Sequence, residues 1–98
     1  MKEAQIRKKA TEIWTKQNWI WWFPAKVRYK KEIDIFGIWD AILLKKDKIN
    51  FIQLTTISNI RAREKKIKEF LKKNNLSIYS EVWGWNEKKK EFKILIIY

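Results

Sequence analysis

The sequence contains no cysteine and no histidine among its 98 residues. Without cysteine the chain can form neither a disulfide nor a thiolate metal site, and a cytoplasmic location is the default expectation, in the host cytoplasm if the protein is viral. Without histidine, triads built on that residue and most zinc sites are excluded. Any catalysis must therefore use carboxylate, amide, hydroxyl, lysine or arginine groups.

Glycine and proline are also scarce, with two glycines and one proline, which leaves little room for long irregular loops. No run of about 18 apolar residues occurs, so we expect no membrane-spanning segment. Hydrophobic residues make up 46% of the chain and include seven tryptophans, which is enough for a packed core. The length suits one core, so we expect residues 1–98 to form a single domain.

Positive charge is the strongest feature of the composition. Twenty-three lysines and arginines against eleven acidic residues give a net charge of +12, spread along the whole chain. A folded domain this basic attracts polyanions at long range, which makes nucleic acid the expected partner. The alternative is a lysine-rich composition inherited from an AT-rich or heat-adapted genome.

Hydrophobic periodicity predicts the element order α-β-β-β-α-β-β. The second helix should be capped by Ser58 or Asn59 and end at Asn74-Asn75, and it is long enough to connect two parallel strands. We therefore expect an α/β fold, with a mixed sheet flanked by helices. The expected elements are a helix over residues 2–17, strands over 19–29, 38–44 and 49–56, a helix to residue 73, and strands over 77–85 and 91–97.

A tight turn at residues 45–48 would set the register of one hairpin. Residue 44 then pairs with residue 49, and Asp40 lies directly opposite Gln53. Strand alternation places Asp40, Gln53 and Thr55 on one face, at the open end of two otherwise apolar strands. An acid there is costly to bury unless it is hydrogen-bonded, paired or bound to a metal. The alternative to a functional role is that Asp40 accepts hydrogen bonds from Gln53, Thr55 or a nearby arginine.

Residues 37–44, GIWDAILL, followed by residues 50–55, NFIQLT, resemble the core of the PD-(D/E)XK nuclease superfamily, which includes archaeal Holliday junction resolvases and related phage nucleases. The resemblance implies a restriction-endonuclease-like α-β-β-β-α-β core and Mg²⁺-dependent cleavage of branched or distorted DNA. The family carries an aspartate on one strand and Glu-X-Lys on the next. Asp40 matches the aspartate, Gln53 stands at the second metal-binding position, and Thr55 stands at the lysine position. The resemblance thus implies Asp40 and Gln53 as the metal ligands.

The departures from the family motif leave two possibilities open. A glutamine oxygen can ligate a hard cation but removes one compensating negative charge, and Thr55 cannot supply the positive charge of a lysine. Either the site is inactive, or other residues complete it.

Three other residues are candidates to complete the site. Arg63 lies in the buried stripe of the second helix and could occupy the space near the missing lysine. Glu3, on the inner stripe of the first helix, and Asp34, shortly before Asp40, could supply further acids. The ordinary alternatives are a salt bridge to Asp40 for Arg63, a helix-end charge for Glu3 and a turn residue for Asp34.

Basic and aromatic residues suggest how nucleic acid would be held. Trp83 and Trp85 lie beside the basic turn Lys88-Lys89-Lys90 and could stack on bases, although a homodimer interface explains so many large apolar side chains more simply. The expected phosphate contacts are Lys26, Arg28 and Lys30 on one strand face, with Arg61, Lys65 and Lys66 on the second helix.

Three hypotheses follow from these observations. The first is a DNA-binding nuclease-like domain, active with Mg²⁺ and forming a homodimer. The second is a non-catalytic DNA-binding or structural protein on the same fold. The third is a single-strand nucleic-acid-binding module that uses tryptophan stacking and no metal.

Overall fold

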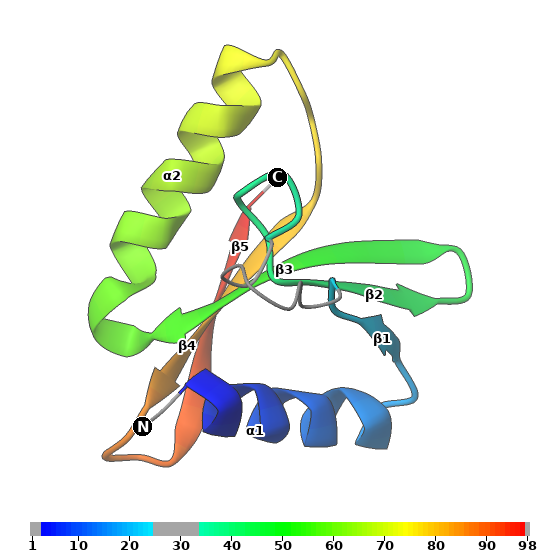
Figure 1. The fold of residues 1–98 in the computed structure, drawn as a ribbon, viewed down its shortest axis with the longest axis vertical. Helices are drawn as coiled ribbons and strands as arrows, with labels where there is room; N and C mark the ends of the chain where they lie inside the picture. Colours follow the sequence, from blue (N-terminus) through cyan, green and yellow to red (C-terminus); the bar gives the residue numbers. More distant parts are fainter. Residues whose placement is uncertain (1–2, 25–33, 98) are drawn as a thin grey trace, which may run out of the picture.

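The computed structural model describes residues 3–24 and 34–97 and has an α/β fold, with two α-helices and a five-stranded mixed sheet (Figure 1). This confirms the expected class and element order. The elements are α1 (Glu3–Lys16), β1 (Ile20–Trp22), β2 (Ala41–Lys45), β3 (Lys48–Thr56), the 3₁₀ turn η1 (Ile57–Asn59), α2 (Ile60–Lys73), β4 (Ser80–Asn86) and β5 (Glu91–Ile97).

The strands lie in the order β1-β2-β3-β4-β5, so each one pairs with its neighbour in sequence. All pairs are antiparallel except β3 and β4, which are parallel. Helix α2 makes the crossover between these two strands, as a parallel pair requires. No helix within the described residues is long and apolar enough to cross a membrane.

The register expected for the β2–β3 hairpin is confirmed. Ala41 lies opposite Ile52 and Leu44 opposite Ile49, but Lys45 also pairs with Lys48. The turn is therefore shorter than predicted and consists of Lys46 and Asp47. Of the strand expected over residues 19–29, β1 occupies residues 20–22, and residues 25–29 lie outside the described part of the chain.

The predicted start of the second helix is confirmed, because Asn59 occupies the N-cap position of α2. Its side chain makes no cap hydrogen bond, and the helix follows directly on η1. The Asn59 amide donates to the Thr56 hydroxyl, at 3.2 Å. At the other end the prediction holds, since Asn74 is the C-cap and its backbone N–H donates to the Phe70 carbonyl.

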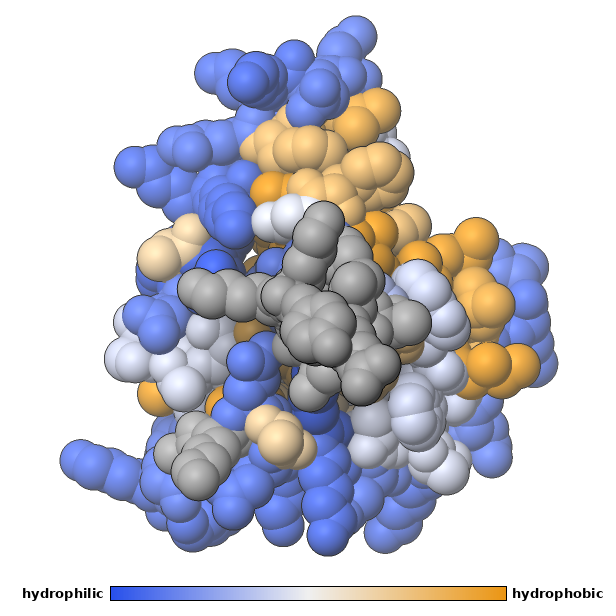
Figure 2. Space-filling model, in the orientation of Figure 1, coloured by the Kyte–Doolittle hydropathy of each residue, from blue (hydrophilic) through white to orange (hydrophobic). Residues whose placement is uncertain are grey.

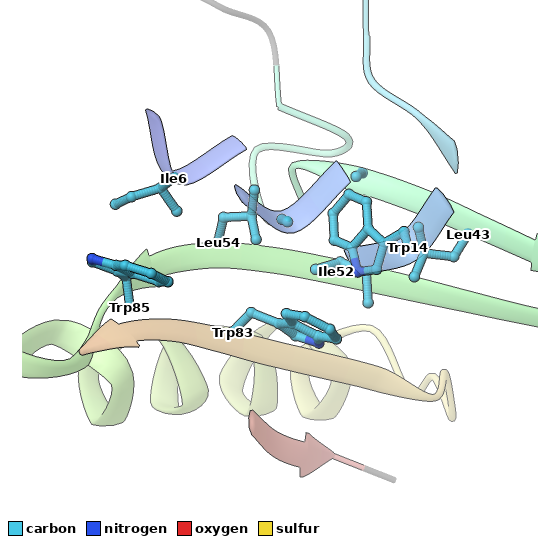
Figure 3. Close-up of a cluster of buried hydrophobic side chains, with 9 residues drawn as sticks. Ile6, Trp14, Leu43, Ile52, Leu54, Trp83 and Trp85 are labelled. Atoms are coloured by element: carbon cyan, nitrogen blue, oxygen red, sulfur yellow. The ribbon is translucent and has the colours of Figure 1, made fainter. Parts of the chain in front are cut away.

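The two helices cover opposite faces of the sheet, and each buries its own hydrophobic cluster. Helix α1 packs its apolar stripe on the face that carries Trp83 and Trp85 (Figure 3). Helix α2 packs on the other face, where the Trp39 indole N–H donates to the Ser80 hydroxyl at 3.0 Å in the buried interior. The cluster under α2 contains Ile38, Trp39, Ile60, Ile67, Leu71, Val82 and Ile97.

Gly84 allows the start of α2 to approach the sheet closely. A Cβ atom at this position in β4 would lie 2.8 Å from Ile60 Cδ1 and 3.2 Å from the Ile57 Cα. The second contact is with backbone, which cannot rotate away as a side chain can. A side chain at residue 84 would therefore push η1 and α2 off the sheet.

We expect Gly84→Val to lower the free energy of unfolding by about 3 kcal/mol, at the upper end of the usual cost of overpacking. The matched control is Gly37→Asn. Gly37 has a φ of +68° and open space around the missing Cβ, and asparagine tolerates this conformation, so the loss there should stay below about 1 kcal/mol. Urea denaturation of both variants measures the difference. Equal losses would show that the close approach at Gly84 is unimportant.

Candidate active-site cleft

Asp40 and Gln53 meet side by side on neighbouring strands, as the register predicted. The backbone N–H of Asp40 donates to the Ile52 carbonyl, which continues the hairpin by one residue beyond β2. The Asp40 Oδ2 atom accepts hydrogen bonds from the Leu54 backbone N–H at 2.7 Å and from Gln53 Nε2 at 3.0 Å. Both side chains are only 5% exposed. The carboxylate is therefore buried and held in a fixed orientation.

Asp34 is the second carboxylate of the site. It is the first residue of a short turn, over residues 34–39, that leads into β2 and is closed by a bridge between Ile35 and Trp39. This turn brings Asp34 close enough to Asp40 for a hydrogen bond between the two carboxyl groups. Such a bond requires a proton on one of them, so the pair resists carrying two negative charges.

The surroundings of Asp40 change its acidity strongly. Burial raises its pKa from the ordinary 3.8 to about 7. The Leu54 N–H opposes this shift, the neighbouring Asp34 adds to it, and the positive charge of Arg7 opposes it weakly. Near neutral pH, Asp40 is thus poised between its protonated and ionised forms.

A cleft of about 260 Å³ opens beside these residues, where the C-terminal end of β3 meets the first turns of α1 and α2. All the residues predicted as catalytic line it, although they come from four separate parts of the chain. Asp40, Gln53 and Thr55 are buried, Asp34 and Arg63 are half-buried, and Glu3 is exposed at the rim. The full lining is Glu3, Ile6, Asp34, Asp40, Gln53, Leu54, Thr55, Thr56 and Arg63.

The polar groups of the cleft partly match what a hard cation needs. Mg²⁺ binds through one or two carboxylates and keeps several of its waters, and Asp34 with Asp40 can supply that number. The Gln53 amide nitrogen donates to Asp40 and to the Leu54 carbonyl, and the expected role of its amide oxygen as a metal ligand stays a prediction. Among the described residues no three acidic side chains converge as a ready-made metal site. Asp34 is the residue that brings a second carboxyl group to Asp40.

Arg63 extends from the first turn of α2 into the cleft. Within the described residues it forms neither an ion pair nor a hydrogen bond with Asp40, so the salt bridge considered as an ordinary alternative is not made. Thr55 likewise makes no hydrogen bond to Asp40 in the described part of the chain. The Arg63 guanidinium is thus a positive group that lines the cleft without pairing with Asp40.

The basic residues of α2 that were predicted to contact phosphates differ in whether they have an acidic partner. Arg61 pairs with Glu64 at 3.1 Å, and Lys65 approaches Glu69 at 3.9 Å. The hydrogen bond from Arg61 is the main cause of a lowered Glu64 pKa. Lys66 is exposed and has no ion pair with any described residue. The predicted contacts on the preceding strand, Lys26, Arg28 and Lys30, lie outside the described residues.

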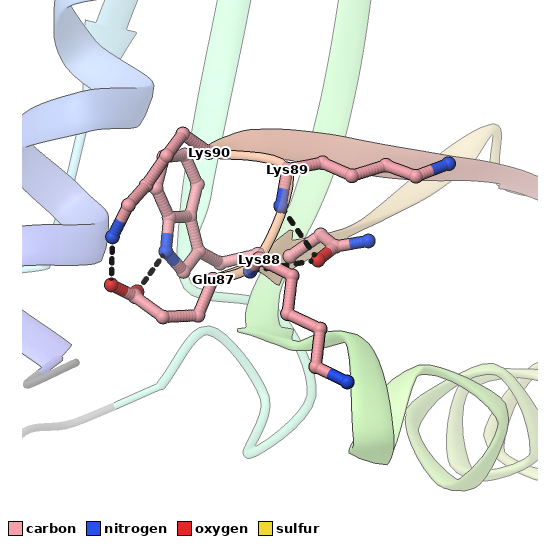
Figure 4. Close-up of polar contacts among 6 residues, drawn as sticks. Glu87, Lys88, Lys89 and Lys90 are labelled. Carbon is pink, nitrogen blue, oxygen red and sulfur yellow. Dashed lines mark hydrogen bonds and ion pairs between the residues drawn. The ribbon is translucent and has the colours of Figure 1, made fainter.

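Trp83 and Trp85, considered in the sequence analysis as rings that could stack on bases, are buried and cannot do so. Each is 5% exposed and packs in the cluster under α1. The neighbouring basic turn is held in place by Glu87. Its carboxylate accepts a hydrogen bond from the Trp85 indole N–H and forms an ion pair with Lys90 (Figure 4). The exposed aromatic rings of the described residues are Trp21, Trp22 and Phe36. The sequence alone did not identify Phe36 as an exposed aromatic residue, although the glycine that follows it, Gly37, is typical of a turn.

No protein-family model matches this chain, and no curated protein matches it either.

The raised pKa of Asp40 predicts an unusual dependence of stability on pH. Between about pH 4 and pH 7 the folded protein binds more protons than the unfolded chain, so the free energy of unfolding falls as the pH rises through this range. Each unit by which the pKa differs between the folded and unfolded states corresponds to about 1.4 kcal/mol in the free energy of unfolding. Because the chain has no histidine, Asp40 should dominate the change.

We expect Asp40→Asn to flatten this pH dependence and to be more stable than the parent protein at pH 8. The exposed Asp47→Asn, which removes the same charge from the β2–β3 turn, is the control and should keep the parent slope. Urea denaturation at several pH values between 4 and 8 measures both. A parent protein whose stability rises over this range would contradict the assignment.

Proposed function

We propose that this chain is a DNA-binding, metal-dependent endonuclease domain whose active site is the cleft formed around Asp34 and Asp40. The observation that carries the proposal is the meeting of two carboxyl groups in one cleft on a chain with a net charge of +12. The positive charge favours a polyanion, and the acid pair favours a divalent cation. A phosphodiester of DNA is the substrate that needs both.

Each residue of the cleft has a role in this proposal. Asp34 and Asp40 would hold Mg²⁺, which when bound polarises a phosphate and lowers the pKa of its water. The Leu54 N–H and the Gln53 amide keep the Asp40 carboxylate pointing into the cleft. Arg63, half-buried at the start of α2, would be the cation of the site and would neutralise charge on the phosphate.

A restriction-endonuclease-like core is part of the same proposal. The observed order of elements and the parallel β3–β4 pair joined by α2 agree with that core. Asp40 stands one residue before β2 and Gln53 lies within β3, at the positions where the resemblance places metal ligands. The resemblance supports this assignment through topology and a short motif together.

A second candidate function is DNA binding without cleavage on the same fold. Two observations favour it: Gln53 replaces an acid and donates its amide nitrogen to Asp40, and Thr55 replaces the lysine. Asp40 would then be a structural acceptor for the Leu54 N–H. This alternative predicts strong DNA binding and no effect of divalent cations.

The expected homodimer stays a prediction, and the sheet offers a surface for it. Ile20, Leu44 and Ile49 lie opposite one another across β1, β2 and β3, and all three are exposed. Hydrophobic surface is visible at the end of the β2–β3 hairpin in Figure 2, whereas hydrophilic residues cover the outer side of α2 and the region of α1. Burial of this apolar patch would favour association.

Cleavage should depend on both carboxylates. We expect Asp40→Ala and Asp34→Asn each to lower Mn²⁺- or Mg²⁺-dependent nicking of supercoiled DNA by at least about 100-fold, since each removes a charged ligand. DNA binding should persist, because both changes make the chain more positive. The measurement is a gel nicking assay alongside Asp47→Asn, which should nick like the parent.

Two results would decide against the enzyme. Nicking that survives Asp40→Ala would place the chemistry elsewhere. Tight DNA binding with no nicking under any divalent cation would favour the second candidate.

DNA binding should also weaken steeply with salt. A protein that replaces several counterions on the DNA loses affinity with a log–log slope of about −0.9 per phosphate contact, so four contacts give a slope between about −3 and −4. Titrations of a labelled duplex from low to moderate ionic strength measure this slope. An affinity that does not change with salt would remove the electrostatic basis of the proposal.

A further inference from the structure

The turn that brings Asp34 to the cleft presents an aromatic ring to solvent two residues later. Phe36 is 76% exposed, more than any other large hydrophobic side chain among the described residues. Its backbone has a φ of +54°, a left-handed conformation that is unfavourable for a bulky side chain. The fold therefore keeps a large apolar ring in water, on a strained backbone, immediately beside the proposed active site.

The ring is braced on one side by the protein. Its centroid lies 6.5 Å from that of Phe70 on α2 and 6.5 Å from that of Trp39, which it meets nearly at a right angle. The turn itself is held by backbone hydrogen bonds from Gly37 to Asp34 and from Ile38 to Ile35. Because the ring is supported and still largely exposed, it is preorganised for a flat partner.

Positive charges flank this ring along α2. Lys66 and Lys73 are four and three residues from Phe70, so they share its side of the helix, and Arg63 continues the same stripe into the cleft. From Arg63 to Lys73 the stripe is about 15 Å long. Within residues 3–24 and 34–97 none of the three takes part in an ion pair.

Other cations of α2 do have acidic partners. Arg61 and Lys68 both pair with Glu64, and Lys65 approaches Glu69. Among the described residues, Arg63, Lys66 and Lys73 make no such pair. These unpaired cations favour an anionic partner at the ring over a second copy of the chain, which would bring the same positive charges.

We infer that Phe36 stacks on an unpaired base while Arg63, Lys66 and Lys73 contact phosphates of the same strand, so that the chain prefers DNA with a single-stranded arm over a continuous duplex. This inference rests on the proposed function for its partner, DNA. A base inside a duplex has both faces covered by its neighbours, so the ring can stack only where a base is unpaired or at an end. The stripe then leads the strand from the ring to the acid pair.

The test compares a forked DNA with a duplex of the same length by fluorescence anisotropy. EDTA is present, so that neither a metal nor cleavage affects the result. The parent protein should bind the fork more tightly than the duplex. Phe36→Ala should lower fork affinity about tenfold, as expected for the loss of one base–aromatic stack, and leave duplex affinity unchanged. Phe36→Tyr should restore the preference, whereas Phe36→Leu, which is apolar but not aromatic, should not.

The charged stripe has a matched control. The double change Lys66→Gln with Lys73→Gln should weaken fork binding several times more than Arg61→Gln with Lys65→Gln. Both pairs remove two positive charges, but the second pair already has glutamate partners. If the two double variants lost the same fork affinity, only net charge would matter, and the assignment of Lys66 and Lys73 as phosphate contacts would be overturned.

A direct readout of stacking is the fluorescence of 2-aminopurine placed at the fork. The parent protein should change this signal on binding, and Phe36→Ala should not. The inference is wrong if Phe36→Ala binds fork and duplex as the parent does, or if its only effect is to turn a dimer into a monomer in light scattering. The second outcome would assign the ring to self-association.

Failure of this inference can be told apart from failure of the proposed function. A protein that prefers forks but never nicks DNA keeps the stacking site and loses the enzymatic proposal. A protein that nicks DNA with Mg²⁺ but binds forks and duplexes equally keeps the enzymatic proposal and loses the stacking site. A protein that binds neither DNA loses both.

Discussion

The hydrogen bonds that the Asp40 carboxylate accepts across the hairpin are the interaction on which the site depends. They join the residue before β2 to the Leu54 backbone and the Gln53 amide. A buried carboxylate without such donors would be very costly, so the strand register and the carboxylate stabilise each other. The same bonds set the direction in which Asp40 faces the cleft, and the turn that contains Asp34 must close against this fixed group.

The arrangement of the two helices explains why a cleft forms at this place. Helix α1 covers one face of the sheet and α2 the other, and their first turns approach the same end of β3. The close contact between Gly84 and the residues at the start of α2 keeps this second wall near the sheet. Asp34 and Asp40, which precede β2, and Arg63 from α2 are therefore brought together at this end of the sheet.

The distribution of charge links this cleft to a surface. The chain has a net charge of +12, yet two carboxyl groups are held together in one cleft, where the burial of Asp40 and the proximity of Asp34 raise the pKa of Asp40 to about 7. On α2 the cations that have a glutamate partner are Arg61, Lys65 and Lys68, whereas Lys66, Lys73 and Arg63 have none among the described residues. In the proposed function, a polyanion would meet these lysines first, then Arg63, and finally the acid pair.

Local patterns in the sequence were sufficient for much of this structure. Alternation and turn chemistry predicted the hairpin register and hence the Asp40–Gln53 contact, because a strand has a strict period of two and a short turn allows few registers. The helical stripe that includes Ile60 and Ile67 likewise predicted that Arg63 would point inward. The absence of histidine and the surplus of lysine restricted the possible chemistry without any structural information.

Only the tertiary structure decided which face each helix covers and which distant groups meet. Trp83 and Trp85 looked like exposed rings beside a basic turn, but α1 packs over them, and no local pattern encodes that choice. Asp34 reaches Asp40, and Phe36 stays in solvent, because a short turn and the neighbouring α2 place them so. Such contacts join residues whose separation in sequence follows no periodicity, so they depend on the packing of the whole chain.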